Sequence, residues 1–353
     1  MSGSLSTVAA AAGRRFTLPR VTEHGPTPPP PSDANEPALC LQKTELGDVA
    51  GHLRDHKFFW LDLEDPSADD VKQLGDLSSL HPLTLSDVTT FSERPKREHY
   101  DGYVSLVVYG VDSDADAGGS LLREVHLIIS GEYVVSVHPA PFDVLDDLRK
   151  RLQEAGVRGE QALIYRILDT VVGTYVPVLA RVDDQIDDIE QAVIARPREE
   201  SLQQIFALKR DLIGMRRVVT PMRDFFARDT DEINHLPGME PDDSLYFRDL
   251  YDSLVRTSDL IDSYRDLLSG ATDMYLSTVA NRQGEISKQL TIIATIFLPL
   301  SFLTGFFGQN FAWLVNNVLN QTWSFFVLGL GLLVASIGLL WIWFRRKGWL
   351  TPD

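Results

Sequence analysis

The sequence predicts an α/β domain followed by long stalk helices and a two-span α-helical transmembrane hairpin. Strand-like runs alternate with helix signals in the first half of the chain, strand signals then vanish, and two charge-free apolar runs lie near the C-terminus. A membrane-spanning helix needs about twenty apolar residues, which these runs supply or approach. The expected segments are a disordered Pro-rich tail (1–40), a cytosolic α/β domain (41–160), a cytosolic helical region and stalk (161–289), a first span (290–307), an extracytoplasmic loop (308–322), a second span (323–344) and a basic cytosolic tail (345–353).

The N-terminal tail is rich in proline and lacks a long apolar stretch. Its segment "HGPTPPPPSDANEP" is typical of a chain that cannot form a packed core, so we expect it to be disordered. Cys40 is the only cysteine among the 353 residues. A disulfide framework and a cysteine-rich metal site are therefore excluded, and the soluble part fits a reducing cytosol.

The α/β domain carries several strand signals and one well-marked helix start. "FFWLDL" (58–63) is typical of a buried strand, and Pro66 and Ser67 then begin a helix. "YVSLVVYGV" (103–111) and "LLREVHLIIS" (121–130) are rich in β-formers, and the second turns at once into "EYVVSVH", as in a β-hairpin. The sequence has no phosphate-binding glycine loop and no GxSxG or HExxH motif, so we do not expect an enzyme.

Helical periodicity dominates after residue 160. Residues 161–228 have a helical pattern with a corner at Pro197, and the long run from Ser244 to Phe307 contains a single proline, Pro299. A helix of about sixty residues would reach roughly 90 Å, more than a compact domain needs. We therefore expect a stalk that leads into a membrane. The stripe expected to pack on its neighbours consists of Leu250, Leu254, Ile261, Tyr264, Leu268, Ala271 and Tyr275.

The charges that flank the two spans predict their orientation. Lys288 precedes the first span, the basic residues Arg345, Arg346 and Lys347 follow the second, and the loop between the spans carries no charge. Because positively charged flanks stay on the cytoplasmic side, both termini are expected in the cytoplasm of a multi-pass protein of the cell membrane. The alternative for the two apolar runs is a pair of buried core helices.

A single hairpin cannot enclose a hydrophilic path, so an ion channel built from this chain must be a ring of several copies. The first span continues from the stalk and is expected to line the axis, with rings of Leu290 and Leu298 as apolar constrictions. Its Ser and Thr hydroxyls either face water or a partner helix, or back-bond to their own helix. The positions expected to face the pore are Gly284, Ser287, Leu290, Thr291, Ala294, Leu298 and Ser301.

The first span contains no carboxylate, so a dehydrated divalent ion would find no charged ligand there. A substantially hydrated cation is therefore expected to pass, and Mg²⁺ fits best because it gives up its waters reluctantly. The formal net charge of −17 argues against nucleic acid as a partner. An acidic surface serves either solubility or the gathering of cations, and the acidic run "DDQIDDIE" (183–190) leaves the same two alternatives open.

The C-terminal segment resembles the CorA-type divalent-cation transporters. The resemblance rests on "KQLTIIATIFLPLSFLTGFFGQNFAW", the second span and the terminal "RRKGWL", and it extends to residues 83–109 and 246–289. It covers roughly residue 45 to the end. The family signature at the end of the first span is Gly-Met-Asn, and Gly308, Gln309 and Asn310 stand in its place as a Gly-Gln-Asn variant.

The resemblance implies a funnel-shaped homopentamer in the bilayer, with divalent ions and copies of itself as its partners. It implies that Asn310 forms a ring at the pore mouth that selects hydrated ions. It further implies that Asp87 and Asp249 hold a regulatory divalent ion between neighbouring cytosolic domains, so that loss of the ion opens the pore. Mg²⁺ would then be both substrate and regulatory ligand, with no other cofactor, and the cluster of Arg345, Arg346 and Lys347 would form a basic ring.

The sequence departs from the family pattern at the positions expected to determine ion selectivity. Gln309 replaces the signature methionine, small residues occupy positions 284 and 287, and the outer loop lacks acidic residues. The alternatives are therefore transport of Mg²⁺, with Co²⁺ or Ni²⁺, and transport of zinc by the same superfamily. Zinc favours His, Cys or carboxylate ligands, and His52 and His56 form an i,i+4 pair without a third partner. A membrane-anchored sensor or scaffold that transports nothing is a further alternative.

Overall fold

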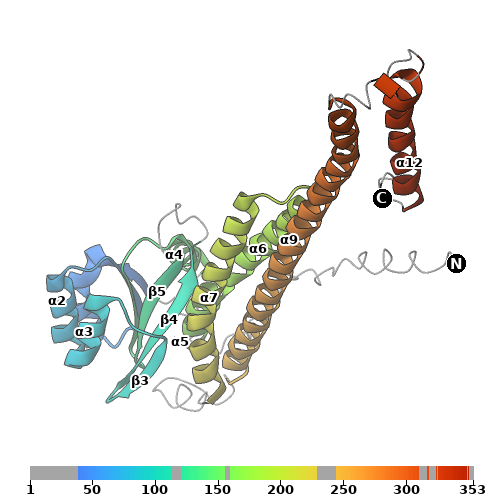
Figure 1. Cartoon of the computed structure of the whole chain (residues 1–353). Coiled ribbons are helices and arrows are strands. Elements are labelled where there is room, and N and C mark those ends of the chain that lie inside the picture. Colours follow the sequence, from blue (N-terminus) through green and yellow to red (C-terminus); the bar gives the residue numbers. More distant parts are fainter. Residues whose placement is uncertain are drawn as a thin grey trace. The chain divides into compact units, whose positions relative to one another are not determined.

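The computed structural model describes residues 39–112, 121–155, 160–228, 244–309, 316–317, 323, 325–347 and 349. The chain divides into two compact units, and each is described by itself. The first unit consists of the chain up to Val178 together with Gly214–Asp259. The second consists of Leu179–Ile213 and the chain from Leu260 onward. The helices α6, α7 and α9 each contribute to both units (Figure 1).

The first unit is built around a six-stranded mixed sheet with the order β1-β2-β6-β5-β4-β3. Strands β1, β2 and β6 are parallel, whereas β6, β5, β4 and β3 are joined as antiparallel neighbours. The β5–β6 pair is the hairpin that the sequence predicts, closed by a hydrogen bond of 2.9 Å from Ser130 N to Tyr133 O. The strands are β1 (Leu39–Gln42), β2 (Phe59–Glu64), β3 (Lys96–Tyr100), β4 (Tyr103–Val111), β5 (Leu122–Ile129) and β6 (Tyr133–His138).

The central strands are buried on both faces because helices cover both sides of the sheet. Every residue of β6 is buried, and so are all but one of β4, which explains their nearly continuous apolar sequences. Helices α2 and α3 lie on one side, and α4, α5, the part of α7 from Gly214 onward and the beginning of α9 lie on the other (Figure 1). The short elements of this unit are the 3-10 helix η1 (Lys43–Asp48), α1 (Val49–Arg54), α2 (Ala68–Ser78), α3 (Pro82–Thr90), α4 (Asp143–Ala155) and α5 (Glu160–Gly173).

Local signals fix the boundaries of several elements. The Ser67 hydroxyl accepts a hydrogen bond of 3.2 Å from Asp70 N and thereby caps α2, as its position before the helical run predicts. The sheet, however, begins two residues earlier than expected. Leu39 and Cys40 belong to β1, where Cys40 is buried, because parallel pairing with Phe59 and Trp60 gives the end of the predicted tail a place in the sheet.

Three long helices follow the α/β elements. Helix α6 spans Tyr175–Ala195, α7 spans Glu199–Arg228, and the corner between them contains Pro197, as predicted. Helix α9 runs without interruption over Ser244–Phe307. The predicted stripe on α9 is buried from Leu250 to Ala271, whereas Tyr275 is half-buried.

The apolar helices differ in how much of their surface is covered. Within the described ranges, two helical stretches are long and apolar enough to cross a membrane, Glu160–Ala195 and Tyr246–Phe306. The apolar window of the first is 61% buried inside the protein, as in a core helix, whereas that of the second is not buried at all. The second predicted span contains a π-helix, Phe325–Gly331, followed directly by α12, Leu332–Arg346.

Candidate ion pathway and regulatory site

The pore-lining positions predicted on α9 share one property: each of them is exposed in the single chain. They are Gly284, Ser287, Leu290, Thr291, Ala294, Leu298 and Ser301. The two leucines are among the most exposed apolar side chains, at 67% for Leu290 and 75% for Leu298. Exposed leucines at these positions are available to other helices, to lipid or to a pore axis.

The threonine hydroxyls of the first span back-bond to their own helix. Thr291 Oγ1 donates to Ser287 O at 2.8 Å, Thr295 Oγ1 to Thr291 O at 2.7 Å, and Thr304 Oγ1 to Leu300 O at 2.9 Å. Of the two alternatives for these hydroxyls, the structure therefore favours back-bonding. A hydroxyl that donates to its helix still has free acceptor lone pairs. It can accept a hydrogen bond from the water shell of a passing cation.

The first two residues of the predicted selectivity filter directly follow α9. Gly308 N donates to Thr304 O at 2.9 Å, and Gln309 N donates to Phe306 O at 3.2 Å. A Cβ atom on Gly308 would lie 3.1 Å from the Thr304 carbonyl oxygen, so close approach to the last helical turn favours glycine here. Asn310, the third filter residue, lies outside the described residues.

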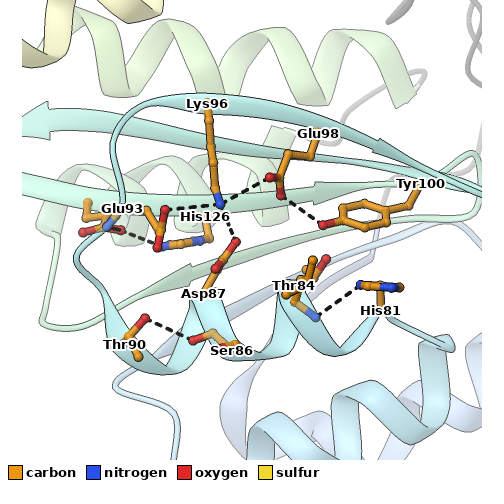
Figure 2. Close-up of polar contacts among 12 residues, drawn as sticks. His81, Thr84, Ser86, Asp87, Thr90, Glu93, Lys96, Glu98, Tyr100 and His126 are labelled. Carbon is orange, nitrogen blue, oxygen red and sulfur yellow. Dashed lines mark hydrogen bonds and ion pairs between the residues drawn. The ribbon is translucent and has the colours of Figure 1, made fainter.

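Asp87, the first predicted regulatory carboxylate, forms an ion pair with Lys96. The Lys96 Nζ atom lies 2.7 Å from Asp87 Oδ2, 3.2 Å from Glu93 Oε2 and 3.4 Å from Glu98 Oε1 (Figure 2). Burial opposes the charged form of Lys96, but hydrogen bonds to Asp87 and Glu93 outweigh it and raise the pKa of the ammonium. Lys96 therefore carries its positive charge between three carboxylates.

A left-handed turn brings Lys96 back to Asp87. Asp87 lies near the end of α3, and Phe91, the C-cap of that helix, has a φ of 43°. This conformation is unfavourable for a bulky residue, and the edge-to-face contact with the His126 ring at 5.5 Å helps to hold Phe91 in place. The chain reverses at Phe91, so that β3 begins at Lys96 beside the last turn of α3 (Figure 2).

Asp249, the second predicted regulatory carboxylate, lies in the first turns of α9 and is half-buried. The buried Tyr165 donates its hydroxyl to Asp249 Oδ2 at 2.9 Å. Partial burial of the carboxyl group and the nearby Asp249 charge raise the pKa of Asp169, whose side chain keeps contact with solvent. Two carboxylates at this place repel each other unless a cation or a proton compensates them.

Asp87 and Asp249 lie on opposite sides of the sheet within one chain (Figure 1). Asp87 is on α3, which covers one side, and Asp249 is at the beginning of α9, on the other. No hydrogen bond or ion pair joins these two carboxylates within the ranges that the structure describes.

Sequence reasoning missed Lys96, Tyr165 and Asp169. Tyr165 and Asp169 are spaced i,i+4 on α5, which places them on one face of the helix, and this spacing could have identified them as a pair. No local pattern links Lys96 to Asp87, because their contact depends on the left-handed conformation at Phe91.

The two histidines considered as a zinc site, His52 and His56, contact different residues. His56 Nδ1 lies 3.0 Å from Glu132 Oε1, whereas the ring of His52 packs against Phe59 with the centroids 6.1 Å apart. Among the residues with described positions, no group of three or more His, Cys, Asp or Glu side chains is arranged to hold a metal ion. A zinc site of that kind therefore has no support in the described part of a single chain.

The acidic run 183–190 forms one face of α6. Asp184, Asp187 and Asp188 are exposed, whereas Ile186 and Ile189 are buried. Burial and the neighbouring Asp187 charge raise the pKa of Asp183. The geometry matches the solvated acidic face of a helix, the plainer of the two predicted alternatives.

The basic cluster lies at the end of α12. Arg345 and Arg346 are exposed in its last turn, where positive charge interacts favourably with the helix dipole. The Arg345 guanidinium lies over the Trp341 ring at 5.3 Å from the ring centroid, and Lys347 N donates to Trp343 O at 3.1 Å. Aromatic and basic side chains at the end of an apolar helix are typical of a membrane interface.

Comparison with known proteins assigns the family. Residues 55–346 match the family model described as CorA-like Mg²⁺ transporter protein. The chain is 33% identical over 286 residues to the Cobalt/magnesium transport protein CorA of Thermotoga maritima, a match that covers 80% of each chain. It is 24% identical over 292 residues to the Zinc transport protein ZntB of Yersinia enterocolitica, covering 82% of this chain and 88% of the relative.

A solved structure supports the fold. The complete structure of the CorA magnesium transporter from Methanocaldococcus jannaschii superposes with a TM-score of 0.70 at 22% identity, covering 82% of this chain and 91% of the other. This likeness confirms the predicted α/β domain, stalk helix and apolar C-terminal hairpin. The chain belongs to the CorA-like Mg²⁺ transporter family and is therefore a membrane protein that transports divalent cations.

Proposed function

We propose that this chain forms a homopentameric channel that carries hydrated Mg²⁺ across the cell membrane, with both termini in the cytoplasm. The observation that carries the proposal is the continuity of α9, which begins in the α/β unit and runs into the charge-free first span. The exposed apolar surface of α9 needs lipid or partner helices around it. Since one hairpin cannot enclose a water-filled path, a ring of α9 helices provides the pore.

The chemistry of the first span favours an ion that keeps its water shell. The seven proposed pore-lining positions carry hydroxyl, methyl, leucine or glycine side chains and no carboxylate. Mg²⁺ dehydrates reluctantly and so suits a pore that contacts its waters rather than the ion. In the proposed pore, Gly308, Gln309 and Asn310 form the mouth, where the Asn310 amides select the hydrated ion. Leu290 and Leu298 form constrictions that close by dewetting.

The proposed regulatory site lies between neighbouring chains, with Asp87 from one chain and Asp249 from the next. Opposite placement of these residues in one chain makes a shared site geometrically reasonable. Asp169 adds a further negative charge beside Asp249. A divalent ion between the carboxylates holds the subunits together, and its loss at low internal concentration leaves like charges that repel and loosen the ring.

The C-terminal cluster Arg345, Arg346 and Lys347 is proposed to form a basic ring at the cytoplasmic end of the second span. Their exposed side chains in and after the last turn of α12 support this role. The bound ion is the only ligand proposed, as substrate and as regulator, and no catalytic reaction is involved.

Flux through the purified protein tests the proposal. The chain is reconstituted in liposomes that contain a Mg²⁺-sensitive dye, and its orientation is checked by protease accessibility. We expect Mg²⁺ influx that Asn310→Ala strongly reduces. A correctly inserted protein that passes no divalent ion would contradict the transport function, and a membrane anchor or scaffold would then remain.

Zinc transport is the second candidate, because Gln309 replaces the methionine of the signature. A competition series with Mg²⁺, Co²⁺, Ni²⁺ and Zn²⁺ in the same liposomes ranks the ions. We expect Mg²⁺ to pass at physiological concentrations. Competing Co²⁺ should lower the Mg²⁺ flux. Flux of Zn²⁺ that Mg²⁺ in large excess leaves unchanged would assign the chain to zinc instead.

A further inference from the structure

The single positive charge of the Lys96 ammonium is in contact with three carboxylates. Its Nζ atom contacts carboxylate oxygens of Asp87, Glu93 and Glu98 at 2.7, 3.2 and 3.4 Å. One ammonium has three protons to donate and so can serve all three partners at once. The three carboxylates and one ammonium together carry a formal charge of about −2, and this excess attracts a further cation.

The backbone of Glu93 and the carboxylate of Glu98 are each held by contacts that do not involve Asp87. The loop that carries Glu93 is fixed by its backbone: Glu93 N donates to Glu124 Oε1 at 3.1 Å, and the Tyr109 hydroxyl donates to Glu93 O at 2.5 Å. Glu98 accepts a hydrogen bond of 3.0 Å from the Tyr100 hydroxyl. If Asp87 is taken by another cation, Lys96 therefore keeps two fixed partners on its own strand and loop (Figure 2).

Lys96 and a divalent ion cannot share Asp87 without cost. The ammonium already occupies Asp87 Oδ2 at 2.7 Å. A Mg²⁺ ion would bind the same carboxylate at about 2.1 Å directly, or slightly farther away through its waters. Two cations on one small carboxylate repel each other, and this repulsion is stronger than in bulk water because Asp87 is only 14% exposed.

We propose that Lys96 is an internal competing cation, which occupies Asp87 in the ion-free state and moves to Glu93 and Glu98 when a divalent ion binds. This inference rests on the proposed regulatory role of Asp87 and deepens it. The affinity of the regulatory site then reflects the free-energy difference between two states of Asp87, one paired with Lys96 and one paired with the ion. Lys96 thereby raises the internal Mg²⁺ concentration that is needed to close the pore.

The test measures closure through Mg²⁺-dependent protection of the full-length protein from limited proteolysis, in detergent or lipid nanodiscs. Lys96→Met and Lys96→Gln both remove the competing charge, and either one suffices if the other does not assemble. We expect the Mg²⁺ concentration at half-protection to fall about tenfold in both variants. Lys96→Arg keeps a cation at this place and is expected to behave as the wild type.

A matched control separates this local effect from the overall charge. Lys150 forms an exposed ion pair with Asp147 at 3.4 Å, away from Asp87, so Lys150→Met changes the net charge equally and should leave the midpoint unchanged. If Mg²⁺ protects the wild type but the Mg²⁺ concentration at half-protection is unchanged or higher in both uncharged Lys96 variants, this inference is wrong, while the proposed regulatory site stands. A wild-type protein that Mg²⁺ does not protect at all would overturn the proposed regulatory site together with it.

Discussion

The Tyr165 hydroxyl donates a hydrogen bond of 2.9 Å to the carboxylate of Asp249 and thereby joins the middle of α5 to the beginning of α9. Both ends of this contact lie in the α/β unit, and Tyr165 is buried while Asp249 is half-buried. The contact fixes the direction of one proposed regulatory carboxylate. It also leaves Asp249 an oxygen that does not take part in this bond.

Removing this hydroxyl is expected to weaken the α/β unit modestly. Tyr165→Phe deletes the donor and should lower the free energy of unfolding by about 1 kcal/mol, because a partly buried acceptor loses its partner. Thermal unfolding of the full chain measures the effect. In an Asp249→Asn background the same substitution should cost clearly less, and a double-mutant cycle with zero coupling would show that the bond contributes nothing.

Reversing the charge of Asp249 is expected to uncouple the pore from internal Mg²⁺. Asp249→Lys places an ammonium where the proposed divalent ion binds, so the ion no longer holds neighbouring chains together. Flux in the liposome assay should then persist at internal Mg²⁺ concentrations that close the wild-type channel. If inhibition by internal Mg²⁺ is unchanged in this variant, Asp249 is not part of the regulatory site.

A methyl group at Gly308 is expected to disturb the pore mouth. The Cβ atom in Gly308→Ala would lie 3.1 Å from Thr304 O, so the end of α9 must shift, and Mg²⁺ flux should fall severalfold without loss of the folded α/β unit. Gly305→Ala is the matched control, since a Cβ there meets nothing within 4 Å outside the backbone of its own helix. Equal fluxes of the two variants would contradict the importance of close approach at Gly308.

Glu160 should make the stability of the α/β unit depend on pH. Burial and the Glu132 charge raise the pKa of Glu160 from 4.5 to about 7 in the folded chain. Because the folded state holds the proton more tightly, this group stabilises folding at low pH, and the contribution is lost as pH rises from about 4.5 through 7. Glu160→Gln should therefore be about 2 kcal/mol more stable than the wild type at pH 8.

The pH series also contains the control for Glu160. Glu132→Gln removes the second cause of the shift and should reduce the pH dependence only in part. Thermal unfolding between pH 4 and 8 follows all three proteins. Parallel curves for the wild type and Glu160→Gln would show that this carboxyl does not titrate in that range.

Two glycines of the α/β unit are expected to respond oppositely to alanine. A Cβ on Gly110, in β4, would lie 2.7 Å from Phe142 Cζ and 3.2 Å from Thr174 Oγ1, so Gly110→Ala should destabilise by about 1–3 kcal/mol. Outside the backbone of its own helix, a Cβ on Gly214, in α7, would meet Leu122 at 3.9 Å. Gly214→Ala should stabilise by up to about 1 kcal/mol through helix propensity, and denaturant unfolding compares both with the wild type.

Local sequence patterns predicted the elements with strong signals. The helical run from Ser244 to Phe307, which contains a single proline, coincides with α9, and the β-rich run 103–111 coincides with β4. These elements depend on hydrophobic periodicity and on residues that favour or stop a helix, and such signals act within a few neighbouring residues. The family and its transport function were likewise predicted from the sequence, because the filter motif and the spans that flank it are contiguous.

The sequence by itself determined the membrane hairpin and the long helix α9, and it predicted Asp87 and Asp249 as a regulatory pair. Only the tertiary structure decided that Asp87 pairs with Lys96, that Asp249 accepts from Tyr165, and that α3 and the beginning of α9, which carry these carboxylates, lie on opposite sides of the sheet. The physical reason is that these contacts depend on the left-handed turn at Phe91 and on the packing of α5 and α9 on one side of the sheet. Neither the turn nor the packing can be predicted from the sequence spacing of the residues that come into contact.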